Sequence, residues 1–364
     1  MKTIIVKLDD NNTDMEALKA AGRIIRSGGL VAFPTETVYG LGADALNPAA
    51  SEKIYAAKGR PSDNPLIVHI YRLEDLYEIA RDVSDAAVRL AGEYWPGPLT
   101  MIFKKKDIVP LKTTGGLDTV AVRMPSNRVA AEFIKEAGGF IAAPSANLSG
   151  RPSPTDASHV IEDMDGRIDM IIDGGSCDIG LESTIVDMTG EVPMILRPGY
   201  ITGDMIKAVT GQVDHDPAVF GKMSEGLRPK APGMKYRHYA PKGDLIIVRG
   251  EREKVISYIS KGINEAAGAG RKTAVLTARE DEDAYPGEAL KISVGARDDE
   301  DEIARHLYGA LRQCDDEGID IIYSEDFSTP RIGQAIMNRL IKAAGHKIVD
   351  VAGTGGTGTV LLPG

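Results

Sequence analysis

The sequence predicts an α/β protein with two domains, a larger one built on a twisted, mixed sheet and a smaller one with parallel strands. The chain has 364 residues, enough for two domains that each bury a core. Short apolar runs alternate with amphipathic segments of helical period in both halves of the chain. Between the halves, from 211 to 242, this periodicity gives way to glycine, proline and charge, which predicts an interdomain linker.

In the first domain, 1–210, helix and strand signals follow one another closely. Thr13-Asp-Met-Glu16 has the spacing of a capping box and predicts the start of a helix. Further helices are expected at 51–57, 84–94 and 127–137. Strands are expected at 30–34, 66–70, 99–104, 119–124, 140–143, 169–172, 184–187 and 192–197. Helices interleaved with strands in this way indicate a mixed α/β sheet.

The second domain, 243–347, shows a simpler alternation of strands and helices. Strands are expected at 244–249, 273–277, 289–294 and 319–323, and helices at 251–268, 299–314 and 330–344. Strands separated by helices predict parallel pairing. The remaining residues, 348–364, include a glycine-rich stretch with no helix after it, and we expect a mobile C-terminal tail.

Composition narrows the classes of function. The net charge of −10 argues against nonspecific binding along a nucleic-acid backbone, although a local basic cleft remains compatible with it. The acidic runs 280–283 and 298–302 are interpreted as solvated segments without chemistry. Cys177 and Cys314 lie far apart, which predicts neither a disulfide framework nor a thiolate zinc site.

The chain carries no signal for a membrane or for secretion. It has no apolar run of membrane-spanning length. Asp9 and Asp10 follow the apolar N-terminal residues too soon for a secretory signal. We therefore expect a cytoplasmic protein that does not contact a membrane.

The turn at Lys58-Gly-Arg60-Pro-Ser-Asp-Asn64-Pro combines two cations with residues that stiffen the chain. Two prolines restrict the backbone and Gly59 permits positive φ, so Lys58 and Arg60 can be held toward a ligand. We expect an anion there, and a phosphate chain above all. The alternative is an ordinary helix end, with cations near the C-terminal dipole, glycine next and proline beyond.

Two arginines have the same placement on different strands. Arg123 and Arg197 each end an apolar strand, just before a proline that breaks the chain. A guanidinium there is costly unless it has an anionic partner, and the repeated placement favours a ligand. The alternative for each is a salt bridge to a neighbouring carboxylate.

Three loops rich in hydroxyl groups complete the set of candidates. The apolar strand ending at Phe33 runs into a turn at 34–42, and ligands of α/β proteins lie at such strand ends. The turn at 145–153 offers donors for phosphate or ribose oxygens, or forms an ordinary Asx or Ser turn. The segment at 183–187 starts a strand with two hydroxyls, for which local capping is equally compatible. His69 ends a strand, where a lone histidine is more commonly a satisfied core residue.

Taken together, these motifs resemble the threonylcarbamoyl-AMP synthases of the YrdC type. The matching segments are 34–42, 58–66, 145–150, 183–187 and 197–199. The tyrosine-bearing linker and the helix expected near 333–344 resemble the longer, two-domain branch, so the likeness covers nearly the whole chain. It implies a YrdC-like catalytic domain and a smaller Rossmann-like domain. From the aromatic and basic residues of 227–241 we also expect that the linker folds over the bound nucleotide.

The resemblance implies a nucleotidyltransferase of tRNA processing that condenses L-threonine, bicarbonate and ATP to threonylcarbamoyl-AMP and pyrophosphate. Carried over by position, the contacts to L-threonine are Thr37, His69, Arg123, Ser183 and Ala143, the last through its backbone. The contacts to ATP are Lys58, Arg60, Asn64, Thr119, Ser145, Asn147, Ser153, Arg197 and linker Tyr236. Lys58 and Arg60 would also be catalytic, because they can neutralise the leaving group together with a Mg²⁺ held mostly by phosphates.

The same resemblance implies partners and leaves two alternatives. Other proteins would transfer the threonylcarbamoyl group to a tRNA adenosine, and direct tRNA contact is compatible with this. The main alternative is a double-stranded RNA or tRNA-binding module without adenylation activity, against which the acidic net charge weighs. The other is a carbamoyl-group transferase domain, although such enzymes carry additional Cys-rich metal fingers that this sequence lacks.

Overall fold

A computed structural model describes residues 2–8, 14–219, 230–231, 239–351 and 359–361 of the chain. The chain divides into two compact units. The first comprises Met1–Ser149 and Ser153–Tyr236, and the second comprises Gly150–Pro152 and Arg237–Gly364. Each unit has its own sheet, as the sequence predicts.

The sheet of the first unit is mixed, with strands in the order β1-β9-β2-β3-β8-β4-β7-β6-β10-β11-β12 and β5 paired with β6. Its strands are β1 Ile4–Lys7, β2 Val31–Phe33, β3 Gly40–Asp44, β4 Ile67–His69, β5 Ala80–Arg81, β6 Leu99–Lys105, β7 Thr119–Arg123, β8 Ile141–Ala143, β9 Met170–Asp173, β10 Thr184–Asp187, β11 Met194–Arg197 and β12 Asp214–His215. The central strands are apolar and buried, because helices and loops cover them. Every strand predicted for this domain is present.

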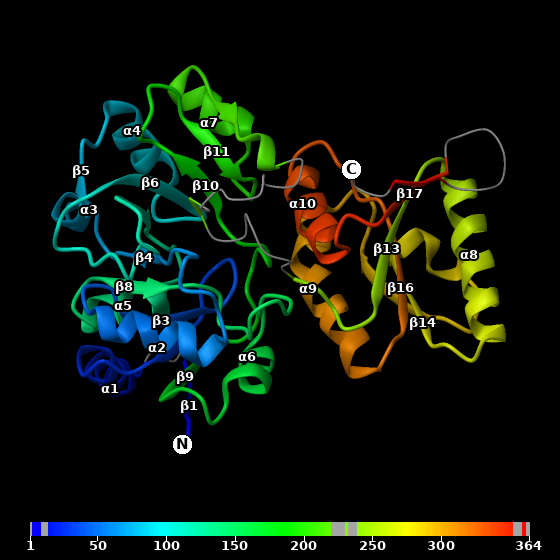
Figure 1. The fold of residues 1–364 in the computed structure, drawn as a ribbon, viewed down its shortest axis with the longest axis horizontal. Helices are drawn as coiled ribbons and strands as arrows, with labels where there is room; N and C mark the ends of the chain where they lie inside the picture. The colour runs from blue at the N-terminus through cyan, green and yellow to red at the C-terminus, as the bar shows by residue number, and fades with distance from the viewer. Residues whose placement is uncertain (1, 9–13, 220–229, 232–238, 352–358, 362–364) are drawn as a thin grey trace. The chain divides into compact units, whose positions relative to one another are not determined.

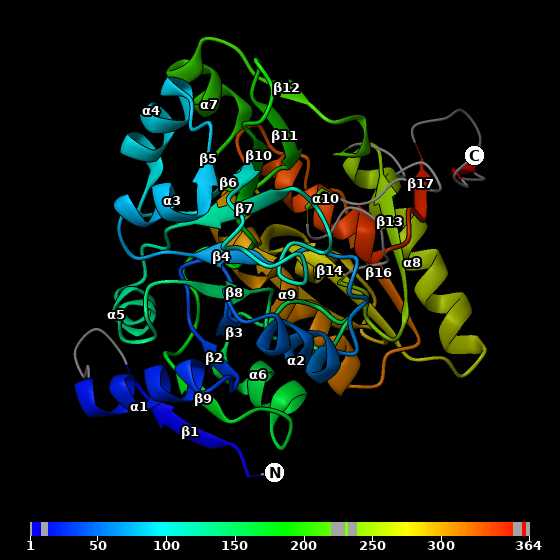
Figure 2. The same ribbon diagram turned by 60° about the vertical axis from the view of Figure 1, so that its left-hand side comes forward.

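The helices of the first unit are α1 Met15–Arg26, α2 Pro48–Lys58, α3 Glu74–Ile79, α4 Asp85–Tyr94, α5 Arg128–Glu136, α6 Ala157–Met164 and α7 Gly203–Thr210. Helices α1 and α5 pack together, and so do α4 and α7, which lie side by side in Figures 1 and 2. α1 begins after Asp14, whose carboxylate accepts from the backbone N–H of Glu16 and Ala17, so Asp14 caps the helix, and Thr13 lies outside the described residues.

One predicted turn contains a strand. The segment 34–42 was expected to be a turn throughout, whereas β3 begins at Gly40 and pairs antiparallel with β2. A Cβ at Gly40 would lie 2.9 Å from the ring of Phe33, and one at Gly42 would lie 2.8 Å from Ile141. Glycine is needed for this close approach, and because glycine weakens strands in general, the sequence pattern conceals the strand.

The second unit has a sheet in the order β15-β14-β16-β13-β17-β18. Its strands are β13 Asp244–Arg249, β14 Thr273–Ala278, β15 Leu290–Gly295, β16 Ile321–Glu325, β17 Ile348–Asp350 and β18 Thr359–Leu361. Strands β13 to β17 pair in parallel, as predicted, and β18 runs antiparallel to β17. Helices α8 Arg252–Gly268, α9 Glu300–Asp316 and α10 Gly333–Ala343 connect them. Figure 1 shows α8 on one face of this sheet and α9 and α10 on the other.

Two features of the second unit differ from the sequence expectation. The segment predicted as a tail contributes β17, which pairs with β13, and the glycine-rich stretch 352–358 lies outside the described residues. The acidic run 280–283 is not fully solvated, because Asp281 is only 1% exposed and forms ion pairs with two arginines. Glu300 of the other run is also buried. Among the helices of the described residues, none is long and apolar enough to cross a membrane.

Candidate active site

A row of paired residues crosses five strands of the first sheet. His69 of β4 lies opposite Arg123 of β7, Arg123 opposite Thr100 of β6, Thr100 opposite Ile185 of β10, and Ile185 opposite Arg197 of β11. Residues paired in register point to the same face of a sheet, and neighbouring strands lie roughly 5 Å apart. His69, Thr100 and both arginines therefore share one face.

Arg123 is buried beside a carboxylate that the sequence analysis did not assign. The Nη2 atom of Arg123 lies 2.7 Å from Oε1 of Glu36, and both side chains are 5% exposed. The ion pair is close but poorly directed, since neither Arg123 Nη2 nor either Glu36 oxygen has a hydrogen-bond partner in the described part of the chain. Buried charged groups in this condition are uncommon in native proteins and indicate a place for a ligand or water.

His69 is neutral at physiological pH. Its ring is buried against Phe33, with centroids 5.9 Å apart in an edge-on arrangement. Burial, reinforced by the charge of Arg123, lowers the pKa of His69 to about 3. Its Nδ1 lies 3.1 Å from the carbonyl oxygen of Ile67, and the backbone of Ile141 is a second hydrogen-bond partner of the ring. The sequence left open whether His69 is a core residue, and the structure shows a buried one at the end of the residue row.

Hydroxyl groups lie next to this row. The Oγ of Ser183 lies 2.7 Å from Oγ1 of Thr100, and it accepts a hydrogen bond from Nη2 of Arg197 at 3.2 Å. The Nε of Arg197 also donates to the carbonyl of Ser183 at 3.0 Å. Thr37 is fully buried and its hydroxyl lies 2.9 Å from that of Thr35. The strand start thus brings the hydroxyl of Ser183 to Arg197, and the turn after β2 holds the hydroxyls of Thr35 and Thr37 together.

Lys58 is both the end of a helix and part of the site. α2 ends at Lys58 with Gly59 in the left-handed conformation, φ 61°, which is the ordinary helix end considered above. The ammonium group does not enter solvent, however, because Lys58 is 2% exposed and donates to the carbonyl oxygens of Ser145 and Asn147. Ser145 Oγ donates to Oδ1 of Asn147 at 2.5 Å. The cation therefore holds the 145–147 turn.

Arg60 of the anion turn bonds to the backbone of the same turn. Nη2 of Arg60 donates to the carbonyl oxygens of Asn64 and Pro65, at 3.4 and 3.1 Å. Asn64 is 2% exposed, and its Oδ1 has no hydrogen-bond partner among the described residues. Thr119 begins β7, so it lies roughly 13 Å along that strand from Arg123. The register places Thr119 opposite Lys104 of β6, at the end of β7 away from His69.

Backbone hydrogen bonds join the loops into one surface. The turn after β2 contacts the 145–153 turn, since Ala146 N donates to Tyr39 O and Tyr39 N donates to Pro154 O. Gly180 N donates to Thr37 O, which attaches the segment before β10. Ser153 is fully buried and donates to Oε1 of Glu182 at 2.5 Å. The predicted residues of these loops are therefore neighbours, although they are far apart in the sequence.

The structure locates almost every residue predicted from the sequence. Ala143 ends β8 beside Ile67 of β4, with its backbone in the sheet and its side chain buried. Tyr236 lies outside the described residues, as does most of the predicted linker. Glu36 and Glu182 have no role predicted from the sequence. Each is an acidic residue in or beside a hydroxyl-rich loop. Such a residue is not found by looking for the ends of apolar strands.

No group of three or more His, Cys, Asp or Glu side chains that could hold a metal occurs among the described residues. Cys177 and Cys314 are free and buried. The site therefore consists of cations, hydroxyls, amides, one neutral imidazole and two buried carboxylates. Such a set binds and orients charged oxygen-rich ligands.

Comparisons with known proteins cover both units. Residues 23–199 match the protein family described as "Telomere recombination", which groups the Sua5, YciO and YrdC proteins. Residues 201–345 match the family described as "Threonylcarbamoyl-AMP synthase, C-terminal domain". The two matches follow each other along the chain with a boundary near 200.

Full-length relatives and a solved structure resemble the whole chain. Threonylcarbamoyl-AMP synthase of Pyrococcus abyssi is 47% identical over 96% of this chain and all of its own length. The enzyme of the same name from Bacillus subtilis is 45% identical over 94% of this chain and 96% of its own. The crystal structure of P. abyssi Sua5 complexed with L-threonine has a TM-score of 0.90 at 46% identity, covering 96% of this chain and 100% of its own.

Proposed function

This chain belongs to the threonylcarbamoyl-AMP synthase family, and from that premise we propose how its residues carry out the reaction. It is a nucleotidyltransferase that condenses L-threonine, bicarbonate and ATP to threonylcarbamoyl-AMP and pyrophosphate. The enzyme names of its full-length relatives favour this activity over an RNA-binding module without catalysis.

The observation that carries the proposal is the buried pair Arg123 and Glu36 with its unsatisfied atoms. A free amino acid presents a carboxylate and an amine a short distance apart, and these groups complement a guanidinium beside a carboxylate. Arg123 binds the carboxylate of L-threonine and Glu36 accepts a hydrogen bond from its amine. The neutral ring of His69 and the hydroxyls of Thr37 and Ser183 contact the rest of the molecule, along with the backbone of Ala143.

ATP occupies the neighbouring loops. Lys58 and Arg60 bind phosphate oxygens, and Arg197 binds a phosphate from the far end of the residue row. Asn64, Thr119, Ser145, Asn147 and Ser153 contact the nucleotide through amide and hydroxyl groups. Support comes from the contacts that gather these residues, since Lys58 donates to the carbonyl oxygens of Ser145 and Asn147 and Arg197 donates to that of Ser183. From the sequence we retain Tyr236 as a further nucleotide contact.

The chemistry fits these side chains. The amine of threonine attacks the carbon derived from bicarbonate, and a carbamate forms with loss of water. A carbamate oxygen then attacks the α-phosphorus, and the bond to pyrophosphate breaks. Because the carbamate is already anionic, the second step needs charge neutralisation more than a base, and Lys58, Arg60 and Arg197 supply it from fixed positions.

Mg²⁺ fits the site as a companion of ATP. Mg²⁺ is commonly held by substrate phosphates and one or two carboxylates, with water completing its shell. Glu182, which is 7% exposed and bonded to Ser153, is a described carboxylate next to the proposed nucleotide contacts. When bound, the ion would neutralise charge on the phosphates, and Glu182 would contact it directly or through water.

The product is a labile mixed anhydride, so its use requires a partner. We propose that a threonylcarbamoyl transferase complex receives it and modifies a tRNA adenosine, and that both act in the cytoplasm. The crystal structure of P. abyssi Sua5 complexed with L-threonine supports L-threonine as a substrate of this chain.

A reaction of the purified chain with ATP, bicarbonate and L-threonine tests the proposal. Mass spectrometry should detect threonylcarbamoyl-AMP, and pyrophosphate should appear in equal amount. L-serine in place of L-threonine serves as the matched substrate, since it lacks only one methyl group. ATP-independent RNA binding without any adenylate would contradict the proposal.

A further inference from the structure

The second unit contains a cavity of about 140 Å³ that the proposed reaction does not use. The cavity lies where the parallel strands reach their carboxyl ends. β13 contributes Val248 and Gly250, the segment after β14 contributes Asp281 and Tyr285, the segment after β15 contributes Arg297, and β16 ends in Glu325. Residues from four consecutive strand ends thus enclose one space.

The topology of the sheet marks this place as a ligand site. β13 and β16 are neighbours, but the chain leaves them in opposite directions. From β13 it passes through α8 to β14, and from β16 it passes through α10 to β17, on the other side of β13. In open α/β sheets, ligands bind in the crevice outside the carboxyl ends of two strands related in this way.

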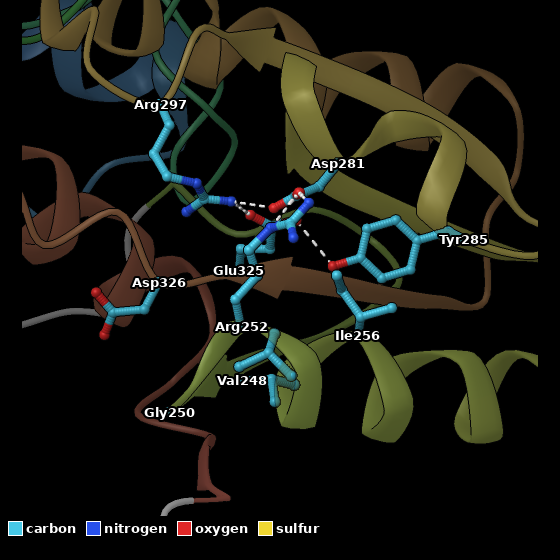
Figure 3. A pocket seen from close by; sticks show the side chains of 10 residues that line it. Val248, Gly250, Arg252, Ile256, Asp281, Tyr285, Arg297, Glu325 and Asp326 are labelled. Carbon is cyan, nitrogen blue, oxygen red and sulfur yellow. Dashed lines mark hydrogen bonds and ion pairs between the residues drawn. The ribbon is translucent and has the colours of Figure 1, made fainter.

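Carboxylates and arginines line the cavity, as Figure 3 shows. Asp281 forms ion pairs with Arg252 and Arg297, and Arg297 also pairs with Glu325. Glu325 further accepts hydrogen bonds from Thr277 and from the hydroxyl of Tyr285. Burial favours the protonated acid, but the bonds and charges of the two arginines outweigh it and lower the pKa of Asp281.

The arginines retain donors for a ligand. Arg297 makes both of its ion pairs through Nη2, and its Nε and Nη1 make no hydrogen bond to a described residue. Its side chain is 41% exposed, and that of Arg252 is 54% exposed. Since a guanidinium has five N–H donors in a fixed fork, each arginine can hold a buried carboxylate and a ligand at once.

The start of α8 adds positive potential to the same wall. α8 has 17 residues, and its N-cap, Glu251, makes no side-chain hydrogen bond to the first turn. Gly250, at the cavity, has φ 145°, a conformation that glycine adopts readily and other residues rarely adopt. The N–H groups of a first turn attract the negative end of a ligand, and here they act together with the arginines.

The charges around the cavity are balanced. Three carboxylates, Asp281, Glu325 and Asp326, and two guanidiniums, Arg252 and Arg297, line the cavity, and Arg249, which is not part of the lining, pairs with Asp326. The three carboxylates would repel a multiply charged anion, and the arginines and the start of α8 would repel a cation. A cavity of roughly 150 Å³ accommodates a molecule the size of benzene. Size and charge together favour a small zwitterion.

We propose that this cavity is a second ligand site, which binds a small α-amino acid. The ligand's carboxylate contacts Arg252, Arg297 and the first turn of α8, and its ammonium group contacts Glu325 or Asp326. The walls formed by Val255 and Ile256 accept a short side chain. The site is separate from the threonine site of the first unit and does not depend on the proposed reaction.

Calorimetric titration of the full chain with each of the twenty proteinogenic L-amino acids tests the proposal. All titrations use the Arg123→Ala chain, so that the threonine site of the first unit does not contribute. We expect binding of at least one amino acid. The affinity should fall by about 10-fold or more in Arg297→Gln, which removes the guanidinium. Ile256→Phe, which fills the cavity and leaves the ion pairs in place, should have the same effect.

The matched control is Arg271→Gln, which removes an exposed arginine of the same unit and should leave the affinity unchanged. Thermal melting of each variant checks that the second unit stays folded. The proposal is overturned if no amino acid binds at millimolar concentration. It is also overturned if binding survives in both cavity variants, or if inorganic phosphate or pyrophosphate binds there and no amino acid does.

Discussion

Nη2 of Arg123 and Oε1 of Glu36 lie 2.7 Å apart in the interior of the first unit, and each side chain is 5% exposed. Arg123 ends β7 and Glu36 lies in the turn after β2, so only the folded sheet brings them together. Removing one member of a buried pair leaves the other charge uncompensated. The pair is therefore expected to govern both stability and threonine binding.

A double-mutant cycle measures the coupling of this pair. Arg123→Ala and Glu36→Gln should each lower the free energy of unfolding by about 3–5 kcal/mol. The double variant should lose less than the sum, with a coupling energy of about 1–3 kcal/mol. Urea unfolding of the four proteins gives the values. Strict additivity would mean that the two groups do not interact.

Arg123→Lys tests the two-pronged contact with threonine. The lysine keeps the charge but offers a single point of contact, so the affinity for L-threonine should fall by about 10-fold or more. The affinity for ATP should change little, because the nucleotide is assigned to other loops. Calorimetry with each ligand separates the two effects. Arg128→Lys, at an exposed position of α5, is the control, and an equal loss in both variants would contradict the assignment.

Lys58→Ala and Arg60→Ala test the neutralisation of the phosphates. Each should slow threonine-dependent release of pyrophosphate by about 100-fold or more, because the transition state loses a charged partner. Lys53→Ala, on the exposed face of α2, should have little effect. Since Lys58 also holds the 145–147 turn, melting curves must accompany the kinetics. Near-normal turnover in both variants would refute the assignment.

Gly199→Ala tests the packing behind the site. A Cβ at Gly199 would lie 2.5 Å from the backbone nitrogen of Thr184 and 2.9 Å from the carbonyl oxygen of Glu182. The start of β10 must shift, and we expect a loss of about 1–3 kcal/mol in stability together with weaker substrate binding. Gly190→Ala, with its nearest neighbour at 3.7 Å, should be almost neutral. Equal behaviour of the two variants would contradict this account.

His69 makes the stability of the fold depend on pH. Its pKa is about 3 when folded and about 6.5 when unfolded, so the unfolded chain binds an extra proton between these values. The stabilisation is complete above pH 6.5 and is lost as the pH falls toward 3, by about 2 kcal/mol at pH 5. His69→Gln should remove this part of the pH dependence. Denaturant unfolding at neutral pH and at pH 5 measures it. His215→Gln, at an exposed position, should retain it.

Local sequence signals predicted the elements well where a single physical rule controls them. The apolar runs of β6, β7 and β10 and the helices of the second unit were recognisable because burial imposes their pattern. β3 was missed because Gly40 and Gly42 serve the packing against Phe33 and Ile141, which the sequence does not display. β17 was missed for a similar reason, since its pairing with β13 is a long-range contact.

The site residues divide in the same way. The cations Lys58, Arg123 and Arg197 could be recognised from the sequence, because each lies close to a proline or at the end of an apolar strand. Glu36 and Glu182 have no such local signal, because each gains its significance from a partner distant in the chain. Asp281 was interpreted as part of a solvated acidic run, and only the approach of Arg252 and Arg297 makes it a buried member of a cavity.

By itself, the sequence determined the α/β class, the two-domain order and the family motifs, because periodicity, turn chemistry and short motifs are properties of neighbouring residues. The tertiary structure alone decided that His69, Arg123, Thr100 and Arg197 form one row across the sheet. It also decided which buried charges meet. Strand order and register depend on contacts between distant segments, whose free energy is spread over the whole core, and no local pattern records them.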